Sequence, residues 1–252
     1  LINKKVSAPR LGHAYSTHGL SGSLGWALAP AVLVLLWFKR KELVIPSDPP
    51  RQATEFVAKS QNFAFLRIPA VWACFGFFLL FAIVISLIQA FAPEAARHLH
   101  GLPVGMAAAC LTIYMVCSAG GMVLGGFLAS DPARCERVVG IAFACAAALS
   151  LVLGLAPLPS LAVPVLFAMM GFAAGTAGPS RDLLVKKTTP DNATGRVYGV
   201  VYAGLDIGQA TAPLLFGPLM DRGQFVGVFI GLAMVQLLLI GGAFNVRKAR
   251  RT

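Results

Sequence analysis

Long apolar stretches separated by short polar segments dominate the pattern along the chain. Seven of them hold about 20 mainly apolar residues each, the length at which a helix crosses a bilayer. Lipid offers no partner to an unpaired backbone group, and no ten-residue alternating barrel pattern occurs, so we expect all seven to be helices. They run from His18 to Phe38, Pro69 to Ala92, Val104 to Ala129, Val138 to Ala156, Ser160 to Gly178, Val197 to Met220 and Gln224 to Asn245. The pattern predicts an all-α integral membrane protein, a polytopic helix bundle of about seven spans.

The polar segments divide the chain into five predicted parts. They are an N-terminal loop (1–17), a transmembrane or re-entrant helix (18–38), a basic cytoplasmic linker (39–68), a six-helix transmembrane half (69–246) and a basic cytoplasmic tail (247–252).

The positions of Lys and Arg predict the orientation. Alternate segments carry sixteen of them (six in the linker, two around Arg134, four around Lys186 and four in the tail), whereas the intervening segments carry only Arg97 and Arg222. Basic residues collect on the cytoplasmic side, so we expect the linker and the C-terminus to lie in the cytoplasm. The span from His18 to Phe38 does not follow this rule, because a single crossing would leave Lys4, Lys5 and Arg10 outside the cytoplasm.

Composition supports a membrane protein and narrows the function. The 252 residues are 57% hydrophobic and only 12% charged, about half the usual charged share, which excludes a soluble enzyme or binding module. The formal net charge of +11 comes from the loops between apolar runs, so we expect a lipid bilayer as partner and no nucleic acid. The five cysteines form no C-x-x-C pair and favour small core residues over ligands. We predict no metal site, no cofactor and no catalytic residue.

The span from Val197 to Met220 carries the most informative polar residues. Asp206 lies near its centre, where a carboxylate costs about 3 kcal/mol to insert and usually has a function. At about 100° per residue, Tyr198, Tyr202 and Gln209 fall on the same side, which predicts a polar stripe facing a water-accessible cavity. A structural hydrogen bond from Asp206 to a neighbouring helix is the alternative.

Glycine pairs inside the spans indicate closely packed helices. Gly204/Gly208 form a small-residue face beside the polar stripe. The G-x-x-x-G spacing lets two helix backbones approach each other. The same spacing occurs at Gly121/Gly125, Gly171/Gly175 and Gly227/Gly231.

Two polar turns bring acids and bases together on the predicted cytoplasmic side. One runs from Gly126 through Asp131, Arg134 and Arg137. The other contains Arg181 and Asp182 directly after Gly178. Both are candidate parts of a cytoplasmic gate, and solvated turns that merely follow the charge rule are the alternative.

Several of these motifs together resemble a known family. Gly178-Pro-Ser-Arg-Asp-Leu-Leu-Val185, Gly195-Arg-Val-Tyr-Gly199 and Gly204-Leu-Asp-Ile-Gly208, followed by Gly217-Pro-Leu-Met-Asp221-Arg-Gly223, resemble the tenth and eleventh helices of major facilitator superfamily transporters. The subgroup they resemble is that of bacterial drug and fosmidomycin-resistance exporters. The Gly126 turn is similar to the superfamily's G-x-x-x-D-R-x-G-R-R signature but carries Pro132 in place of a basic residue. His18 to Pro30 resembles the fifth helix.

The resemblance implies a C-terminal six-helix half plus one preceding helix, in a bacterial inner membrane. It implies secondary active transport of an unknown small solute by alternating access, with protons as the coupling ion. It also implies that the first four helices precede Leu1, so that transport needs the missing half or a second copy. The alternatives are a non-transport polytopic protein, either an intramembrane enzyme or a scaffold, and an inactive truncated product.

Overall fold

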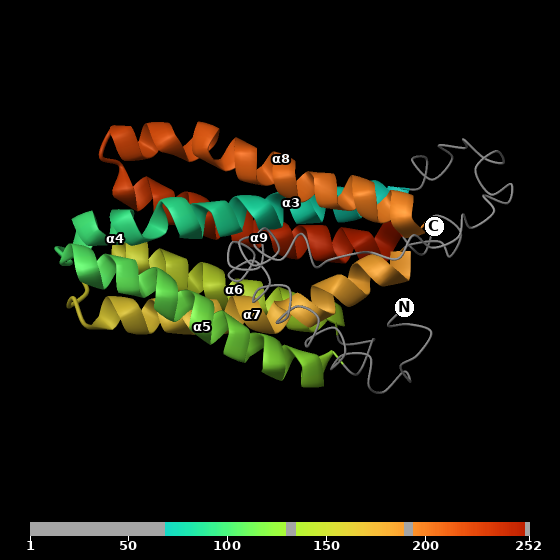
Figure 1. Ribbon diagram of the computed structural model, residues 1–252, viewed down its shortest axis with the longest axis horizontal. Helices are drawn as coiled ribbons and strands as arrows, with labels where there is room; N and C mark the ends of the chain where they lie inside the picture. Colours follow the sequence, from blue (N-terminus) through green and yellow to red (C-terminus); the bar gives the residue numbers. More distant parts are fainter. Residues whose placement is uncertain (1–68, 130–134, 189–193, 250–252) are drawn as a thin grey trace, which may run out of the picture.

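The described part of the chain is entirely helical. A computed structural model describes residues 69–129, 135–188 and 194–249, and within them every regular element is a helix. Six long helices lie side by side and one short helix crosses their end (Figure 1). Their bounds are α3 (Pro69–Ala90), α4 (Ala92–His100), α5 (Val104–Leu128), α6 (Cys135–Leu155), α7 (Ala162–Thr188), α8 (Thr194–Asp221) and α9 (Phe225–Ala249). The predicted all-α polytopic bundle is confirmed, while the predicted segments 1–17, 18–38 and 39–68 lie outside the described residues.

Two local features differ from the sequence prediction. The short helix α4 replaces part of an expected loop, and it ends at Gly101, whose φ of 62° is left-handed and suits a residue without Cβ. Helix α7 continues to Thr188, ten residues beyond the predicted end at Gly178, although Pro179 lies inside it. Neighbouring helices can compensate for the hydrogen bond that a proline removes within a membrane bundle, so Pro179 does not end the helix.

The long helices contact one another in the order α8, α3, α9, α6, α7, α5. The same pairs are neighbours, in reversed order, when the first three long helices (α3, α5, α6) are exchanged with the last three (α7, α8, α9). The arrangement therefore has the pattern of two interleaved three-helix repeats, because each neighbouring pair joins a helix of one repeat to a helix of the other, with the α6–α9 pair at the centre. Helix α4 packs across the end of the bundle against α3, α5 and α9.

Glycines create the closest helix contacts, as their spacing predicts. A Cβ at Gly121 or Gly125 on α5 would overlap backbone carbonyls of α7, and one at Gly175 on α7 would overlap the carbonyl of Ser118 on α5. The equivalent contact at the other end of this order places Gly204 and Gly208 of α8 on the backbone of α3. The fourth pair differs, because Gly227 and Gly231 of α9 face the side chains of Leu219 and Phe216 instead of a backbone.

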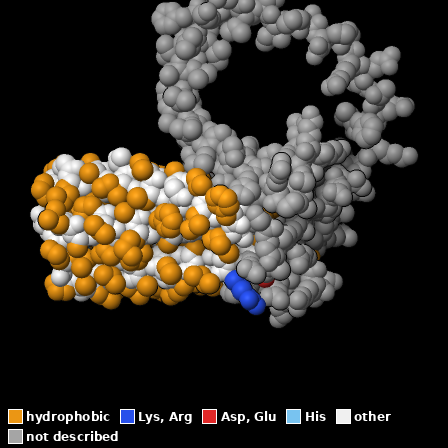
Figure 2. Space-filling view, turned by 90° about the horizontal axis from the view of Figure 1, so that it is seen from below, with side chains coloured by type: hydrophobic (Ala, Val, Ile, Leu, Met, Phe, Trp, Pro, Cys, Tyr) orange, Lys and Arg blue, Asp and Glu red, His pale blue; other side chains and the backbone are white. Residues whose placement is uncertain are grey.

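The bundle is apolar inside and outside. The large side chains of Phe78, Phe143, Phe167 and Phe229 are fully buried between the helices. Figure 2 shows hydrophobic side chains across one outer face, with Lys or Arg atoms visible where this face borders the residues drawn in grey. Among the described residues, five helices (α3, α5, α6, α7 and α9) are long and apolar enough to cross a membrane. Helix α8 has 28 residues and is not one of these five.

Candidate functional site on helices α3, α7 and α8

Helix α8 presents one side to α3 and leaves its polar side open. Gly204 and Gly208 are buried on α3: a Cβ at Gly204 would lie 2.8 Å from the carbonyl oxygen of Phe75. Tyr202, Asp206 and Gln209 are exposed on the other side, the Tyr202 side chain by 44%. The structure thus places these three predicted residues together on one open face. Tyr198, the fourth, has no described side chain.

Asp206 lies near the middle of α8, in the part of the helix that crosses the bundle beside α3. Its carboxylate is exposed in the described bundle. A carboxylate facing lipid at mid-membrane would cost on the order of 3 kcal/mol. Its position is therefore more compatible with a water-filled space or a facing polar partner than with lipid.

Arg181 and Asp182 lie inside the helical bundle instead of in a turn. Both belong to α7, and their side chains are only 16% and 20% exposed. The Arg181 Nε donates to Asp182 Oδ1 at 2.9 Å, and a terminal guanidinium nitrogen lies 2.9 Å from the same oxygen. The polar turn expected at this position is corrected: the helix continues through both residues.

Aromatic rings from α3 cover the Arg181 side chain. The guanidinium carbon lies 4.3 Å from the centre of the Phe81 ring and 5.3 Å from that of Phe78. Phe78 in turn contacts the Tyr202 ring, with centres 5.6 Å apart. We call Arg181, Asp182, Phe78, Phe81 and Tyr202 the Arg181 cluster. Each cation–π contact of this kind contributes about 0.5–2 kcal/mol, and the cluster joins a predicted gate pair to a predicted cavity residue.

A small hollow lies farther along the same two helices. Ser86, Gln89 and Ala90 of α3 and Gln209 of α8 line it, and its volume is about 170 Å³. The Ser86 hydroxyl donates to the backbone carbonyl of Gln209 at 3.4 Å. Ser86 and Gln89 were not predicted as site residues, although two polar side chains three residues apart near the end of an apolar span were a usable signal.

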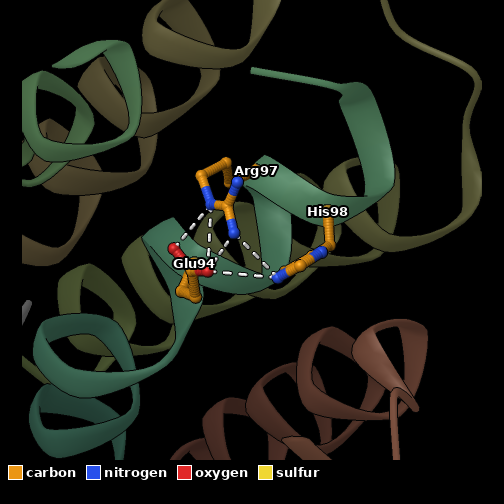
Figure 3. A network of polar contacts seen from close by, with 3 residues as sticks. All are labelled: Glu94, Arg97 and His98. Atoms are coloured by element: carbon orange, nitrogen blue, oxygen red, sulfur yellow. Dashed lines mark hydrogen bonds and ion pairs between the residues drawn. The ribbon is translucent and has the colours of Figure 1, made fainter. Parts of the chain in front are cut away.

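A polar network at the α4 end is separate from this face. Arg97 donates to Glu94 at 2.6 Å, and His98 Nε2 lies 3.1 Å from the same carboxylate (Figure 3). The hydrogen bond from Arg97 lowers the pKa of Glu94, and Glu94 raises the pKa of Arg97. The His98 ring stacks on Phe225 of α9 with centres 4.4 Å apart. The ring contact with Phe225 joins this network within α4 to the bundle end.

A comparison with known families decides the classification. The family model described as Major Facilitator Superfamily matches residues 8–213, well over half of the chain. The chain belongs to the major facilitator superfamily. No curated protein matches the sequence significantly.

Membership in the major facilitator superfamily identifies a multi-pass membrane transporter of small solutes. It favours transport over enzymatic chemistry. The match is to the superfamily as a whole, so the narrower resemblance to drug and fosmidomycin exporters stays a prediction.

The other predicted gate residues of this superfamily member are placed only in part. Arg137 is exposed in the first turn of α6. Asp131 and Arg134 lie outside the described residues, so a joint gate of this turn with Arg181 and Asp182 stays a prediction. No group of three or more His, Cys, Asp or Glu side chains that could hold a metal occurs among the residues that the structure describes.

Proposed function

We propose that the chain carries out secondary active transport of a small solute by alternating access, coupled to protons. Asp206 would bind a proton or contact the solute, and Tyr198, Tyr202 and Gln209 would line the route. The observation that carries this proposal is the exposed carboxylate at the middle of α8, on the side opposite the glycines that pack on α3. Intramembrane ionisable groups of this kind usually mark ion or substrate pathways.

The Arg181 cluster would respond to the state of this route. Arg181 and Asp182 are bound to each other and covered by rings of α3, while Tyr202 belongs both to the cluster and to the polar side of α8. A movement of α8 relative to α7 would therefore disturb the cluster directly. We assign Arg181 and Asp182, together with Asp131, Arg134 and Arg137, to closing the cytoplasmic side, with the C-terminus in the cytoplasm of a bacterial inner membrane.

Alternating access requires a second bundle that faces this one across the solute route. The open polar side of α8 is the surface that we assign to this contact. The partner would be an N-terminal half of the same transporter or a second copy.

The test is proton movement in proteoliposomes that enclose a pH-sensitive dye. A panel of small solutes is added to vesicles containing the protein, and solute-dependent change of internal pH is recorded. We expect Asp206→Asn to reduce this signal at least about a hundredfold, the lower end of the range for removing a proton-transfer group. Asp221→Asn, at the exposed end of the same helix, is the matched control and should retain it. Equal signals from both variants would remove Asp206 from the mechanism.

A further inference from the structure

A proline in α8 leaves one backbone carbonyl without its helical donor. Pro213 lies inside the helix and has no N–H, so it cannot donate to the carbonyl of Gln209 four residues earlier. The Ser86 hydroxyl donates to this carbonyl instead, at a long 3.4 Å. Such a contact is weak by the usual criteria, so most of the acceptor capacity of the Gln209 oxygen remains available.

This oxygen lies at the hollow between α3 and α8. Helix carbonyls point toward the C-terminal end of their helix, which for α8 is the end near α4 (Figure 1). Gln89 and Ala90 line the hollow from α3 close to that same end. The carbonyl of Gln209 therefore points along the axis toward the end of α3 at which Gln89 and Ala90 line the hollow.

The lining of the hollow is rich in oxygen acceptors. Three of its four lining residues, Ser86, Gln89 and Gln209, have a side-chain oxygen, and no cationic side chain belongs to the described lining. Asp206 lies three residues before Gln209 on the same exposed side of α8, about 4.5 Å along the axis. Its carboxylate supplies a negative charge one turn away, so the local field favours a cation.

We propose that the hollow between α3 and α8 is a subsite for a small cation, held by the freed Gln209 carbonyl, Ser86 and Gln89, and attracted by Asp206. Its volume of about 170 Å³ accommodates an ammonium group or a hydrated inorganic cation. Drug-sized ligands occupy about 300–1,000 Å³, so only the charged end of a larger solute would enter. The inference rests on the proposed function in taking this side of α8 as the solute route, and it adds the charge class of the ligand.

The first experiment probes the electrostatic potential at the hollow and does not depend on transport activity. Ala90→Cys is introduced into the protein with its five native cysteines replaced by Ala, and its reaction with a cationic and an anionic methanethiosulfonate is compared. We expect Asp206→Asn to lower the cationic-to-anionic rate ratio about five- to tenfold, the scale of one charge within about 10 Å of the thiol. Leu161→Cys, exposed by 77% in the connection before α7, is the control and should show no change.

The second experiment tests the freed carbonyl and identifies the cation. Millimolar methylammonium or Na⁺ is added as a protectant of Ala90→Cys, with acetate as the anionic control. We expect a cation to slow modification and acetate to have no effect. Protection by methylammonium alone indicates an organic ammonium, and protection by Na⁺ alone indicates an inorganic ion. Pro213→Ala restores the helical donor to Gln209 and should weaken protection at least about tenfold while retaining the Asp206-dependent rate ratio.

The outcomes separate this inference from the proposed function. Equal protection by methylammonium, Na⁺ and acetate, or unchanged protection in Pro213→Ala, would overturn the cation subsite. Selective cation protection combined with unaltered proton movement in Asp206→Asn would support the subsite and refute proton coupling through Asp206.

Discussion

Ser150 of α6 and Gln236 of α9 form a fully buried contact. We expect substitutions at its two residues to change the free energy of unfolding in opposite directions. The Ser150 hydroxyl has one proton and three acceptors around it: the Ala146 carbonyl at 2.9 Å, the Gln236 Oε1 at 3.1 Å and the Met170 sulfur at 3.3 Å. The Nε2 of Gln236 is buried without a partner. One hydroxyl can satisfy one end of the amide, so the other end stays unpaired in either orientation of the amide.

Whether each variant is more or less stable depends on two free-energy contributions, that of the hydrogen bond and that of the unpaired amide. An interhelical hydrogen bond within a membrane bundle contributes about 0.6 kcal/mol and at most about 1.7, whereas a buried unpaired donor costs about 1–3 kcal/mol. Gln236→Met keeps the length and flexibility of the side chain but removes both the hydrogen bond and the unpaired donor. We therefore expect it to raise the free energy of unfolding by about 0.5–2 kcal/mol. Ser150→Ala leaves the whole amide unpaired and should lower it by about 1–2 kcal/mol.

The assay is reversible unfolding in mixed detergent micelles, with the free energy extrapolated to the native detergent. The double variant completes the cycle: Ser150→Ala should cost almost nothing in the Gln236→Met background, because the unpaired amide is already gone. If Gln236→Met instead destabilised the bundle by 1 kcal/mol or more, the reasoning about the unpaired amide would be refuted.

Two further predictions concern helix contact and pH. Gly208→Ala should destabilise the bundle by about 1–3 kcal/mol, because the added methyl group overlaps the Leu79 carbonyl. Gly217→Ala is the control and should not destabilise it, because a Cβ at Gly217 meets nothing within 4 Å. The same unfolding assay measures both variants, and equal losses of stability would contradict the close contact at Gly208. The Arg97 hydrogen bond lowers the pKa of Glu94 below 4.5, so its stabilisation of α4 is present above pH 4.5 and lost as pH falls through the lowered value. Hydrogen exchange in α4, corrected for its intrinsic rate, should therefore increase at low pH in the native protein but not in Glu94→Gln.

Much of the bundle could be predicted because membrane helices must be long and apolar. The expected span from Val104 to Ala129 begins with α5 and ends one residue after it, and the span from Gln224 to Asn245 begins one residue before α9 and ends four residues before it does. The short helix α4 was missed because its composition is polar, and apolar length detects only elements that cross the membrane. The continuation of α7 was missed because Gly178 and Pro179 normally end a helix in water. Within the bundle, neighbouring helices override this local preference.

The candidate site was predictable only within a single helix. The period of the α-helix places Tyr202, Asp206 and Gln209 on one side of α8, and the structure shows them there. The contacts of Arg181 with Phe78 and Phe81 join α7 to α3. Such contacts depend on helix order and rotation, which no local pattern specifies.

The polar side of α8 and its glycines have a common physical explanation. Lipid tails are as apolar as leucine side chains, so a membrane helix gains little from burying leucine and more from close van der Waals contact. Gly204 and Gly208 provide that contact through the backbone of α3, without requiring large apolar side chains on α8. The other side of the helix is then free to carry Asp206 and Gln209, and the proline that frees the Gln209 carbonyl is tolerated because Ser86 of α3 donates to it. The pairing with α3 thus both stabilises α8 and permits its polar side, so we expect substitutions that separate the two helices to impair folding and transport together.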